Sequence, residues 1–415
     1  MKLVGNISLK TFDKETYEVK GEAMRVLIGS ESFYPNISGV AVTTFNLASY
    51  LARRGHEVAV MVPSPRYRNF SESFPEGFTV LRVASVWHPF RKGFRVTVYP
   101  LSLARRVVRE WRPDIVHLQD PTSIGSALLK ACREEKIPVV ISHHFTLEYV
   151  LAYLWFLRPF HGFLRRKLTS AMVKFYNQCR HVICPSETVR RDLLAAGVAV
   201  PVTAISNGVD LDRFFAYEPP LAVRLAFHLP AKPIVLYVGR MDPDKSLDTL
   251  IKAMPLILAR HDVHFVLCGT GNLREKFERW VRKDGLAPHV TFLGPFANHS
   301  ENLPRLYQLA TCFVIPSGIE SQSIVTLEAM ASGLPIVAAR AGALPELVTD
   351  GENGFLFKLG DPEDLAAKVN LLLADEELRK LMGKKSLEKV VAHKLEASMA
   401  RIEEIYHRVV RNGKA

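Results

Sequence analysis

The chain has 415 residues, of which 48% are hydrophobic and 23% charged. This length predicts two domains of about 200 residues each, because a single hydrophobic core stops growing at about 250–300 residues. The composition is typical of a soluble globular enzyme. An integral membrane protein is excluded as an interpretation, because the sequence contains no apolar run near the ~20 residues that a membrane span requires.

The N-terminal residues MKLVGNISLKTFDKETYEVKGEA alternate charged with apolar side chains and do not resemble a signal peptide. We therefore expect an extension over residues 1–23 and a cytoplasmic location, with Met24 as an alternative natural start. The five cysteines are scattered and none is spaced as a metal-binding pair, as expected in a reducing compartment.

Most of the net charge of +12 lies in the first half of the chain. Residues 1–213 hold 29 Lys+Arg against 18 Asp+Glu, whereas the remainder holds 25 against 24. This asymmetry predicts that the first half meets a polyanion or an anionic surface, and both membrane headgroups and nucleic acid are open as partners at this point.

Short apolar runs bounded by turn residues alternate with helical patterns from Arg25 onward, which is typical of an α/β fold with buried parallel strands. The runs form two series, the first at 25–29, 57–63, 114–118, 137–143, 181–186 and 202–208, and the second at 233–239, 263–269, 290–294, 312–317 and 335–340. Two Rossmann-like, doubly wound domains follow from this pattern, with ligands bound where the strands end, in a cleft between the domains.

Turn residues and a proline pair after Asn207 mark the join between these domains. We expect an N-terminal domain over residues 24–213 and a C-terminal domain over residues 214–395. A separate C-terminal helix is expected over residues 396–415.

Two glutamates, Glu320 and Glu328, lie on either side of a helix start in the stretch SGIESQSIVTLEAMASGLP. Ser323 is a suitable N-cap, so the amides of Ile324 and Val325 would form an anion site at the helix N-terminus. A binding pair is one interpretation. The other is one surface-loop glutamate and one helix-face glutamate without a role.

A second polar loop, YVGRMDPDKS, follows the strand at 233–239. Its two cations, Arg240 and Lys245, suit a diphosphate, although a solvated loop has the same composition. Gly269 and Gly271 offer a close approach to phosphate or ribose, but a tight strand-to-helix turn explains them equally well.

Three further motifs carry candidate residues. Gly39 precedes a helix, where it either lets a phosphate approach or only permits the turn. His143 and His144 end a strand, where either can assist chemistry, although structural histidines are more common. Two Asp-x-Asp triplets, at 210–212 and 242–244, have a pattern that can bind a divalent metal, but we interpret both as incidental.

Taken together, these motifs resemble the retaining glycosyltransferases of family 4, which have the GT-B fold. The matching segments run in family order from about Arg25 and are YPNISGVAV, HLQDP, SHHF, PSETVRRDL, ISNGVDLDRF, YVGRMDPDKS, ENLPRLYQLATCFVIPSGIESQSIVTLEAMASGLPIVA and LVTDGENGFLF. The resemblance implies two Rossmann-like domains facing a central cleft, a C-terminal helix that returns to the N-terminal domain, and hexosyl transfer from a nucleotide sugar.

The resemblance also implies a role for each motif residue. Arg240 and Lys245 would hold the donor diphosphate, and Gly39 and the amides of Ile324 and Val325 would line the same pocket. Glu328 would bond the ribose and Glu320 the transferred sugar. His144 would lie beside the anomeric carbon. His143 is the less favoured candidate for that last place.

Both glutamates are thus assigned to binding, whereas a double-displacement glycosidase needs two carboxyls flanking one bond about 5–5.5 Å apart. Retention in the family is explained by attack on the same face of the sugar, with the leaving diphosphate accepting the proton. Stabilising that leaving group is then the main catalytic task, and His144, Arg240, Lys245 and Glu320 form the predicted catalytic set. No metal and no cofactor is expected beyond a UDP- or GDP-sugar as co-substrate.

Basic and aromatic residues are interleaved in two stretches of the first half, over residues 87–113 and 149–186. The second stretch holds six basic residues and no acidic one. This composition is typical of a segment that lies on an anionic membrane surface, although a core helix with a solvated basic face is the alternative.

The motifs SHHF and QSIVTLEAM look most like the branch of the family that adds glucose or a related hexose to diacylglycerol, although His143 departs from its pattern. We therefore expect a lipid acceptor and a peripheral location at the inner face of the cell membrane. A soluble acceptor, such as a sugar phosphate, is the alternative. A nucleic-acid-binding protein is disfavoured, because no binding module is recognisable.

Overall fold

The computed structural model describes residues 22–35, 38–87, 95–144, 160–219, 221–296 and 300–414. The chain divides into two compact units. Unit 1 comprises Met1–Ile205 and Met399–Ala415, and unit 2 comprises Ser206–Ser398. Residues 206–213, which the sequence-based boundary gave to the first domain, are therefore part of unit 2, and the chain returns to unit 1 for its last segment.

Unit 1 is built on an eight-stranded sheet with the strand order β10-β9-β8-β7-β1-β2-β4-β3. All neighbouring strands are parallel except the antiparallel pair of β3 and β4, and β5 and β6 form a separate antiparallel pair. The strands are β1 (Arg25–Gly29), β2 (Glu57–Pro63), β3 (Phe70–Ser73), β4 (Thr79–Val83), β5 (Ser85–Trp87), β6 (Arg95–Thr97), β7 (Ile115–Leu118), β8 (Val139–Ser142), β9 (His181–Cys184) and β10 (Val202–Ala204).

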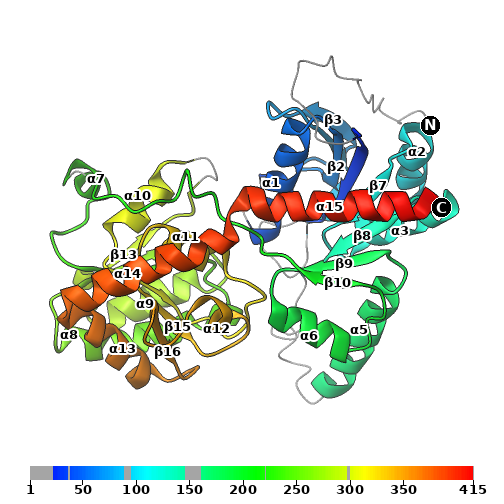
Figure 1. The fold of residues 1–415 in the computed structure, drawn as a ribbon. Coiled ribbons are helices and arrows are strands. Elements are labelled where there is room, and N and C mark those ends of the chain that lie inside the picture. The colour runs from blue at the N-terminus through cyan, green and yellow to red at the C-terminus, as the bar shows by residue number, and fades with distance from the viewer. Residues whose placement is uncertain are drawn as a thin grey trace. The chain divides into compact units, whose positions relative to one another are not determined.

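The helices of unit 1 connect these strands and cover the sheet (Figure 1). They are α1 (Gly39–Arg53), α2 (Leu101–Trp111), α3 (Ser123–Glu134), α5 (His161–Tyr176) and α6 (Glu187–Ala195), together with the C-terminal helix α15 (Leu395–Lys414). From Met399 onward, α15 is part of unit 1, where the Tyr406 hydroxyl lies 2.5 Å from Nδ1 of the buried His117 on β7.

Unit 2 contains a six-stranded, fully parallel sheet with the order β13-β12-β11-β14-β15-β16. The strands are β11 (Ile234–Val238), β12 (His264–Cys268), β13 (Val290–Leu293), β14 (Cys312–Ile315), β15 (Ile336–Ala339) and β16 (Gly354–Phe357). The helices are α7 (Leu221–Ala226), α8 (Leu247–Leu258), α9 (Arg274–Lys283), α10 (Asn302–Leu309), α11 (Ile324–Ala331), α12 (Leu344–Leu347), α13 (Pro362–Ala374) and α14 (Glu376–Val390), with short 3₁₀ helices η2 (Pro243–Lys245), η3 (Ala287–His289) and η4 (Val391–His393).

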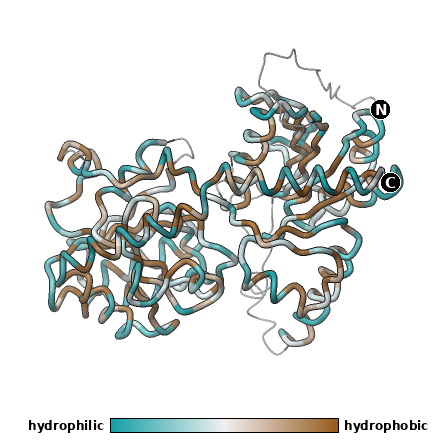
Figure 2. The backbone as a smooth tube through the Cα atoms, in the orientation of Figure 1, coloured by the Kyte–Doolittle hydropathy of each residue, from teal (hydrophilic) through white to brown (hydrophobic). Residues whose placement is uncertain are grey.

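The central strands consist mostly of apolar residues, because helices cover both faces of each sheet. Every residue of β11 (IVLYV) is buried, as is every residue of β14 (CFVI), and the hydrophobic segments of the chain coincide with the two sheets in Figure 2. The prediction of two Rossmann-like domains with parallel sheets is confirmed.

Each sheet has a point where the strand order reverses. In unit 2 the chain runs outward from β11 through β12 to β13, and then returns to the other side of β11 with β14. The reversal therefore lies between β11 and β14, and that in unit 1 lies between β1 and β7. In open α/β sheets, ligands bind at the carboxyl ends of the strands beside such a point.

Candidate functional site

The loops that leave β11 and β14 bring five charged side chains of unit 2 together. Arg240 Nη2 lies 3.0 Å from Asp244 Oδ2, and its Nη1 bonds Asp242. Lys245 Nζ lies 2.8 Å from Glu320 Oε1 and 3.5 Å from Asp244 Oδ2. We call these five residues the charge cluster. The structure thus brings Arg240, Lys245 and Glu320, all predicted site residues, to the strand reversal of the second sheet.

Backbone contacts hold this cluster in place. The Tyr237 hydroxyl, at the end of β11, donates to the carbonyl oxygen of Arg240 at 2.6 Å. Asp242 accepts a hydrogen bond from the amide of Asn272 at 2.9 Å, and the Ser317 hydroxyl donates to the carbonyl oxygen of Asp244 at 3.3 Å. The loops after β11, β12 and β14 are therefore fastened to one another.

The second Asp-x-Asp triplet, which we interpret as incidental for metal binding, has a role in positioning Arg240. Asp242 and Asp244 are both buried, and both pair with Arg240. The carboxylates therefore position the cation. The first triplet has only a local role, because Asp210 Oδ1 accepts the amides of Asp212 and Arg213 in a turn.

Helix α11 begins directly after the loop that carries Glu320. Ser323 is its N-cap residue in extended conformation, but the Ser323 side chain accepts no hydrogen bond from the first-turn amides. Its hydroxyl instead accepts from the Thr326 hydroxyl at 2.8 Å. The amides of Ile324 and Val325, predicted to face an anion, are thus left without a side-chain cap.

Glu328 lies on the second turn of α11, where the Tyr307 hydroxyl of α10 donates to its Oε2 at 2.8 Å. Burial raises the pKa of Glu328 to about 7, against the smaller opposing effects of the Tyr307 hydrogen bond and of Arg213. Tyr307 itself is fully buried, so its hydroxyl holds the Glu328 carboxylate from within the core of unit 2.

The glycines of LCGTGN are explained by packing within unit 2. A Cβ atom on Gly269 would lie 1.9 Å from the carbonyl oxygen of Gly239, and one on Gly271 would lie 2.5 Å from that of Met241. Gly269 also has a φ of +142°. Close approach of two backbones therefore requires both residues to be glycine, whatever ligand lies beside them.

The two histidines after β8 in unit 1 have different surroundings. His143 is buried and its Nδ1 lies 2.8 Å from the Tyr176 hydroxyl. His144 is partly exposed and its Nε2 donates to Gln119 Oε1 at 2.9 Å. Burial lowers the pKa of His144 to about 4, so the ring is neutral near pH 7. A neutral ring can donate and accept hydrogen bonds, but it has no imidazolium proton to give as a general acid.

Gly39 is the remaining predicted site residue in unit 1. It is the first residue of α1 and is exposed. Its neighbour Ser38 caps the helix by accepting from the amide of Ala41. Helix α1, which Gly39 begins, follows β1, and His144 follows β8, so both residues come after the carboxyl ends of strands of the first sheet.

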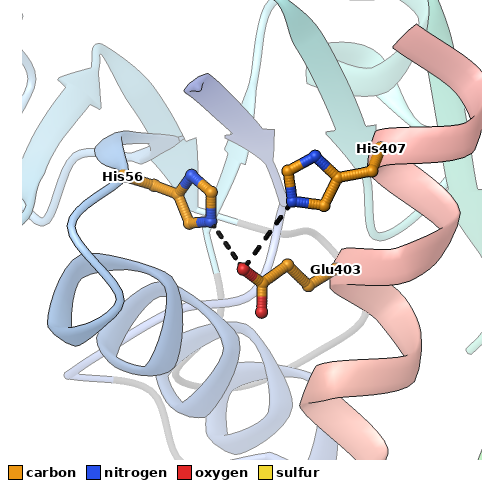
Figure 3. Close-up of side chains that lie close together, drawn as sticks. All are labelled: His56, Glu403 and His407. Atoms are coloured by element: carbon orange, nitrogen blue, oxygen red, sulfur yellow. Dashed lines mark hydrogen bonds and ion pairs between the residues drawn. The ribbon is translucent and has the colours of Figure 1, made fainter. Parts of the chain in front are cut away.

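A separate cluster, formed by His56, Glu403 and His407, contains metal-ligating residue types (Figure 3). His56 Nδ1 accepts the amide of Met24 at 3.1 Å, so the proton lies on Nε2, which donates to Glu403 Oε1 at 2.9 Å. A metal ligand would need a lone pair on that nitrogen. The cluster therefore suits an internal hydrogen-bond network that fastens α15 to unit 1 better than it suits a metal ion.

Helix α5 presents an unusual surface on unit 1. Its first ten residues, His161–Ser170, include no buried side chain, and only Met172 and Tyr176 are buried further along. Phe160 and Phe163 are 63% and 55% exposed. We call Phe160, Phe163, Arg165, Arg166 and Lys167 the basic-aromatic surface.

Leu164 and Leu168 of this half are partly buried while Arg165, Arg166 and Lys167 are exposed, so the predicted alternative, a packed helix with a solvated basic face, stays open beside the membrane-surface interpretation. The earlier part of the basic stretch, residues 149–159, lies outside the described residues, as do residues 88–94 of the other stretch. Within the helices that the structure describes, none is long and apolar enough to cross a bilayer.

Comparison with known proteins matches both halves of the chain. The family model described as Glycosyltransferase Family 4 matches residues 37–213, and the model described as Glycosyl transferases group 1 matches residues 227–389.

Several curated relatives are similar over most of the chain. A sulfoquinovosyl transferase of Arabidopsis thaliana is 31% identical, covering 88% of this chain and 70% of its own. A GDP-mannose-dependent α-mannosyltransferase of Mycobacterium tuberculosis is 30% identical, covering 82% of this chain and 85% of its own. An α-monoglucosyldiacylglycerol synthase of Acholeplasma laidlawii is 26% identical, covering 80% and 85%.

Solved structures share the fold. A sucrose-phosphate synthase of Thermosynechococcus elongatus superimposes with a TM-score of 0.78 at 21% identity, covering 94% of this chain and all of that one. The Anabaena protein HepE, solved in complex with UDP-glucose, gives a TM-score of 0.74 at 20% identity, covering 93% of this chain and all of that one.

Two doubly wound units with these matches define a retaining, nucleotide-sugar-dependent glycosyltransferase of the GT-B fold. Within that class, the chain belongs to glycosyltransferase family 4.

The sequence interpretation missed the residues that position the site. Asp242, Asp244, Tyr307 and Gln119 each hold a predicted site residue by a side-chain bond. Only the two aspartates had a signal, namely their alternation beside Arg240, and it was considered for metal binding alone.

Proposed function

We propose that this glycosyltransferase moves a hexose from a UDP- or GDP-sugar to a lipid acceptor such as diacylglycerol at an anionic membrane surface. The basic-aromatic surface is the observation that carries the acceptor class. Exposed phenylalanines beside three cations match the chemistry of a bilayer interface, where rings enter the headgroup region and cations meet anionic lipids.

One relative adds support, because its name, α-monoglucosyldiacylglycerol synthase, describes a product that contains diacylglycerol. A second exposed aromatic group consists of Tyr67, which lies between β2 and β3, and Trp87 of β5. The Arg95 guanidinium of β6 lies against both rings, with its Cζ atom 4.5 and 4.7 Å from their centroids. Such rings prefer an interface between apolar and aqueous surroundings.

On the donor side, the charge cluster and the start of α11 would meet the diphosphate. Arg240, Lys245 and the amides of Ile324 and Val325 would stabilise the leaving diphosphate. The bond from the anomeric carbon to the phosphate oxygen breaks, and the acceptor oxygen bonds to the same face of the sugar. The acceptor proton passes to the leaving phosphate oxygen, so no metal ion is needed in this proposal.

The remaining residues would orient the donor. Glu328 accepts the ribose hydroxyls and Glu320 those of the transferred sugar. Unit 1 contributes Gly39, whose backbone approaches a donor phosphate, and His144, whose neutral ring lies beside the anomeric centre in this assignment.

Vesicle flotation tests the acceptor side. At low salt, the wild type should float with vesicles of phosphatidylcholine and phosphatidylglycerol but not with phosphatidylcholine alone. Replacing Arg165, Arg166 and Lys167 by alanine should weaken binding about a hundredfold, since each cation adds about 1 kcal/mol near an anionic leaflet.

The matched control replaces Arg279, Arg282 and Lys283 by alanine, which removes three exposed cations from α9 of unit 2. This variant should float like the wild type. The lipid acceptor would be contradicted if the wild type did not float with anionic vesicles and glycosylated a soluble sugar phosphate but not diacylglycerol.

A further inference from the structure

Lys245 and Glu320 form a well-protected ion pair in unit 2, and both have been assigned to the donor. Their side chains are only 15% and 10% exposed, and Nζ and Oε1 are 2.8 Å apart. In the proposed function, however, Lys245 bonds the diphosphate and Glu320 bonds sugar hydroxyls. The pair that the structure shows therefore has to change when the donor enters.

The charge balance of the cluster gives the same result. Two cations, Arg240 and Lys245, face three carboxylates, those of Asp242, Asp244 and Glu320. Such a cluster repels a diphosphate, which itself carries two negative charges. When one carboxylate moves away from the cations, its attraction to them falls with distance. The cations are then available to the diphosphate in its place.

Asp242 and Asp244 are poorly suited to be released. Both are buried, Asp242 is also bonded to the Asn272 amide, and both hold Arg240. Asp244 additionally shares its Oδ2 between Arg240 and Lys245. Glu320 is different, because Lys245 is its one cation partner among the salt bridges of the described residues.

The backbone at Glu320 is fixed, so its side chain is the part that can move. The carbonyl oxygen of Glu320 accepts the amide of Ala343 at 2.9 Å. Gly342, with a φ of +53°, packs so closely that a Cβ atom there would lie 2.5 Å from that oxygen. Rotation about the side-chain bonds of Glu320 can redirect the carboxylate without disturbing this contact.

We propose that Glu320 acts as an internal substitute for the donor diphosphate, which displaces it from Lys245 and thereby frees it for the hydroxyls of the transferred sugar. This inference rests on the proposed roles of Lys245 and Glu320. It has a consequence for selectivity between donor and product. A nucleotide sugar offers hydroxyls to the displaced carboxylate, whereas the nucleoside diphosphate product does not, so the product binds with an unpaired carboxylate and leaves more readily.

The test measures binding of UDP and of GDP to the protein by calorimetry. Glu320→Gln removes the competing charge while keeping the shape of the side chain. Whichever of UDP and GDP binds to the wild type, we expect the Glu320→Gln variant to bind it about three- to tenfold more tightly than the wild type does. Turnover of the nucleotide sugar should fall in the variant. Glu320→Ala should tighten binding in the same direction.

The matched control is Asp262→Asn, which breaks another lysine–carboxylate pair of unit 2, between Lys232 Nζ and Asp262 Oδ1 at 2.6 Å. It should leave nucleoside diphosphate affinity unchanged. Equal or weaker binding by both Glu320 variants would overturn the inference while leaving the proposed function intact. Failure of the wild type to bind either UDP or GDP would contradict the diphosphate site itself, and the inference with it.

Discussion

Glu328 links the protonation of one buried side chain to donor binding. Its pKa is raised to about 7, chiefly by burial, and an ionised carboxylate is the better acceptor for two ribose hydroxyls. We therefore expect the affinity for UDP or GDP to fall about tenfold from pH 8 to pH 6, as the carboxyl group takes up a proton. Calorimetry at constant ionic strength across this range measures the effect.

Glu328→Gln serves as the control for this prediction, because its side chain does not titrate. Any pH dependence that remains in the variant comes from the phosphate of the ligand. The same shift makes the free energy of unfolding fall as the pH rises from about 4.5 to about 7, because the folded protein keeps a proton that the unfolded chain has lost. Identical binding profiles for the two proteins would refute the role of the carboxyl group.

At this scale, the sequence predicts which residues gather but not how they bond. Arg240, Lys245 and Glu320 follow apolar runs, so their arrival at one sheet edge was predictable from strand order in doubly wound folds. Their ion pairs were not. The choice of Glu320 as the partner of Lys245 depends on a loop conformation that Gly342 permits by close backbone contact, and no local pattern encodes such a contact.

Helix α15 is held by a carboxylate that unit 1 surrounds with donors. Glu403 Oε2 accepts the Tyr50 hydroxyl at 2.9 Å and lies 3.5 Å from Arg54 Nε, while Oε1 accepts from His56. Burial lowers the pKa of His56, which keeps its ring neutral and its Nε2–H available. One carboxylate thus satisfies groups on α1 and on the turn that follows it.

Replacing Glu403 by alanine should therefore loosen the attachment of α15. We expect a loss of about 2–4 kcal/mol in unit 1, because the change leaves buried donors without an acceptor. Hydrogen exchange of the amides in α15 measures this locally. Glu404→Ala is the matched control, since the neighbouring Glu404 is exposed and its loss should change stability by less than about 0.5 kcal/mol. Equal exchange in the two variants would contradict the account.

The elements themselves differ in how well the sequence predicts them. The central strands are predicted directly from their apolar runs, because burial on both faces favours apolar residues; the buried His117 of β7 is an exception whose ring bonds Tyr406 and Ser142. Strand β3 (FSES) lies at the sheet edge and is partly exposed, and the paired strands β5 and β6 have three residues each, so no apolar run indicates them. Helix α5 is the opposite case. Its composition indicated a surface role, but only the structure shows that its first half has no fully buried side chain.

On the scale of the whole chain, the order of residues and the division into units do not coincide. Unit 2 is one continuous segment, Ser206–Ser398, whereas unit 1 is completed only by Met399–Ala415. That last segment buries apolar side chains in unit 1, namely Met399, Ile402, Ile405, Tyr406 and Val409. The end of the chain is therefore a structural part of the unit that contains its beginning.

A chain that ends at Ser398 should accordingly lose stability in unit 1 while unit 2 stays folded. Each of the five buried apolar side chains contributes about 1.5–3 kcal/mol to the free energy of unfolding. Their combined loss is comparable to the whole stability of an ordinary domain. We expect hydrogen exchange to become fast in β1, β7 and α1, with slow exchange kept in β11, β12 and β14. Binding of UDP or GDP should stay within about tenfold of the full chain, because most groups assigned to the diphosphate, namely Arg240, Lys245 and the amides of Ile324 and Val325, lie in unit 2 and only Gly39 lies in unit 1. A chain that ends at Arg411, which loses only exposed residues among those described, should behave as the full protein in both measurements. Slow exchange throughout unit 1 in the shorter chain would show that α15 is dispensable there and would contradict the assignment of this helix to unit 1.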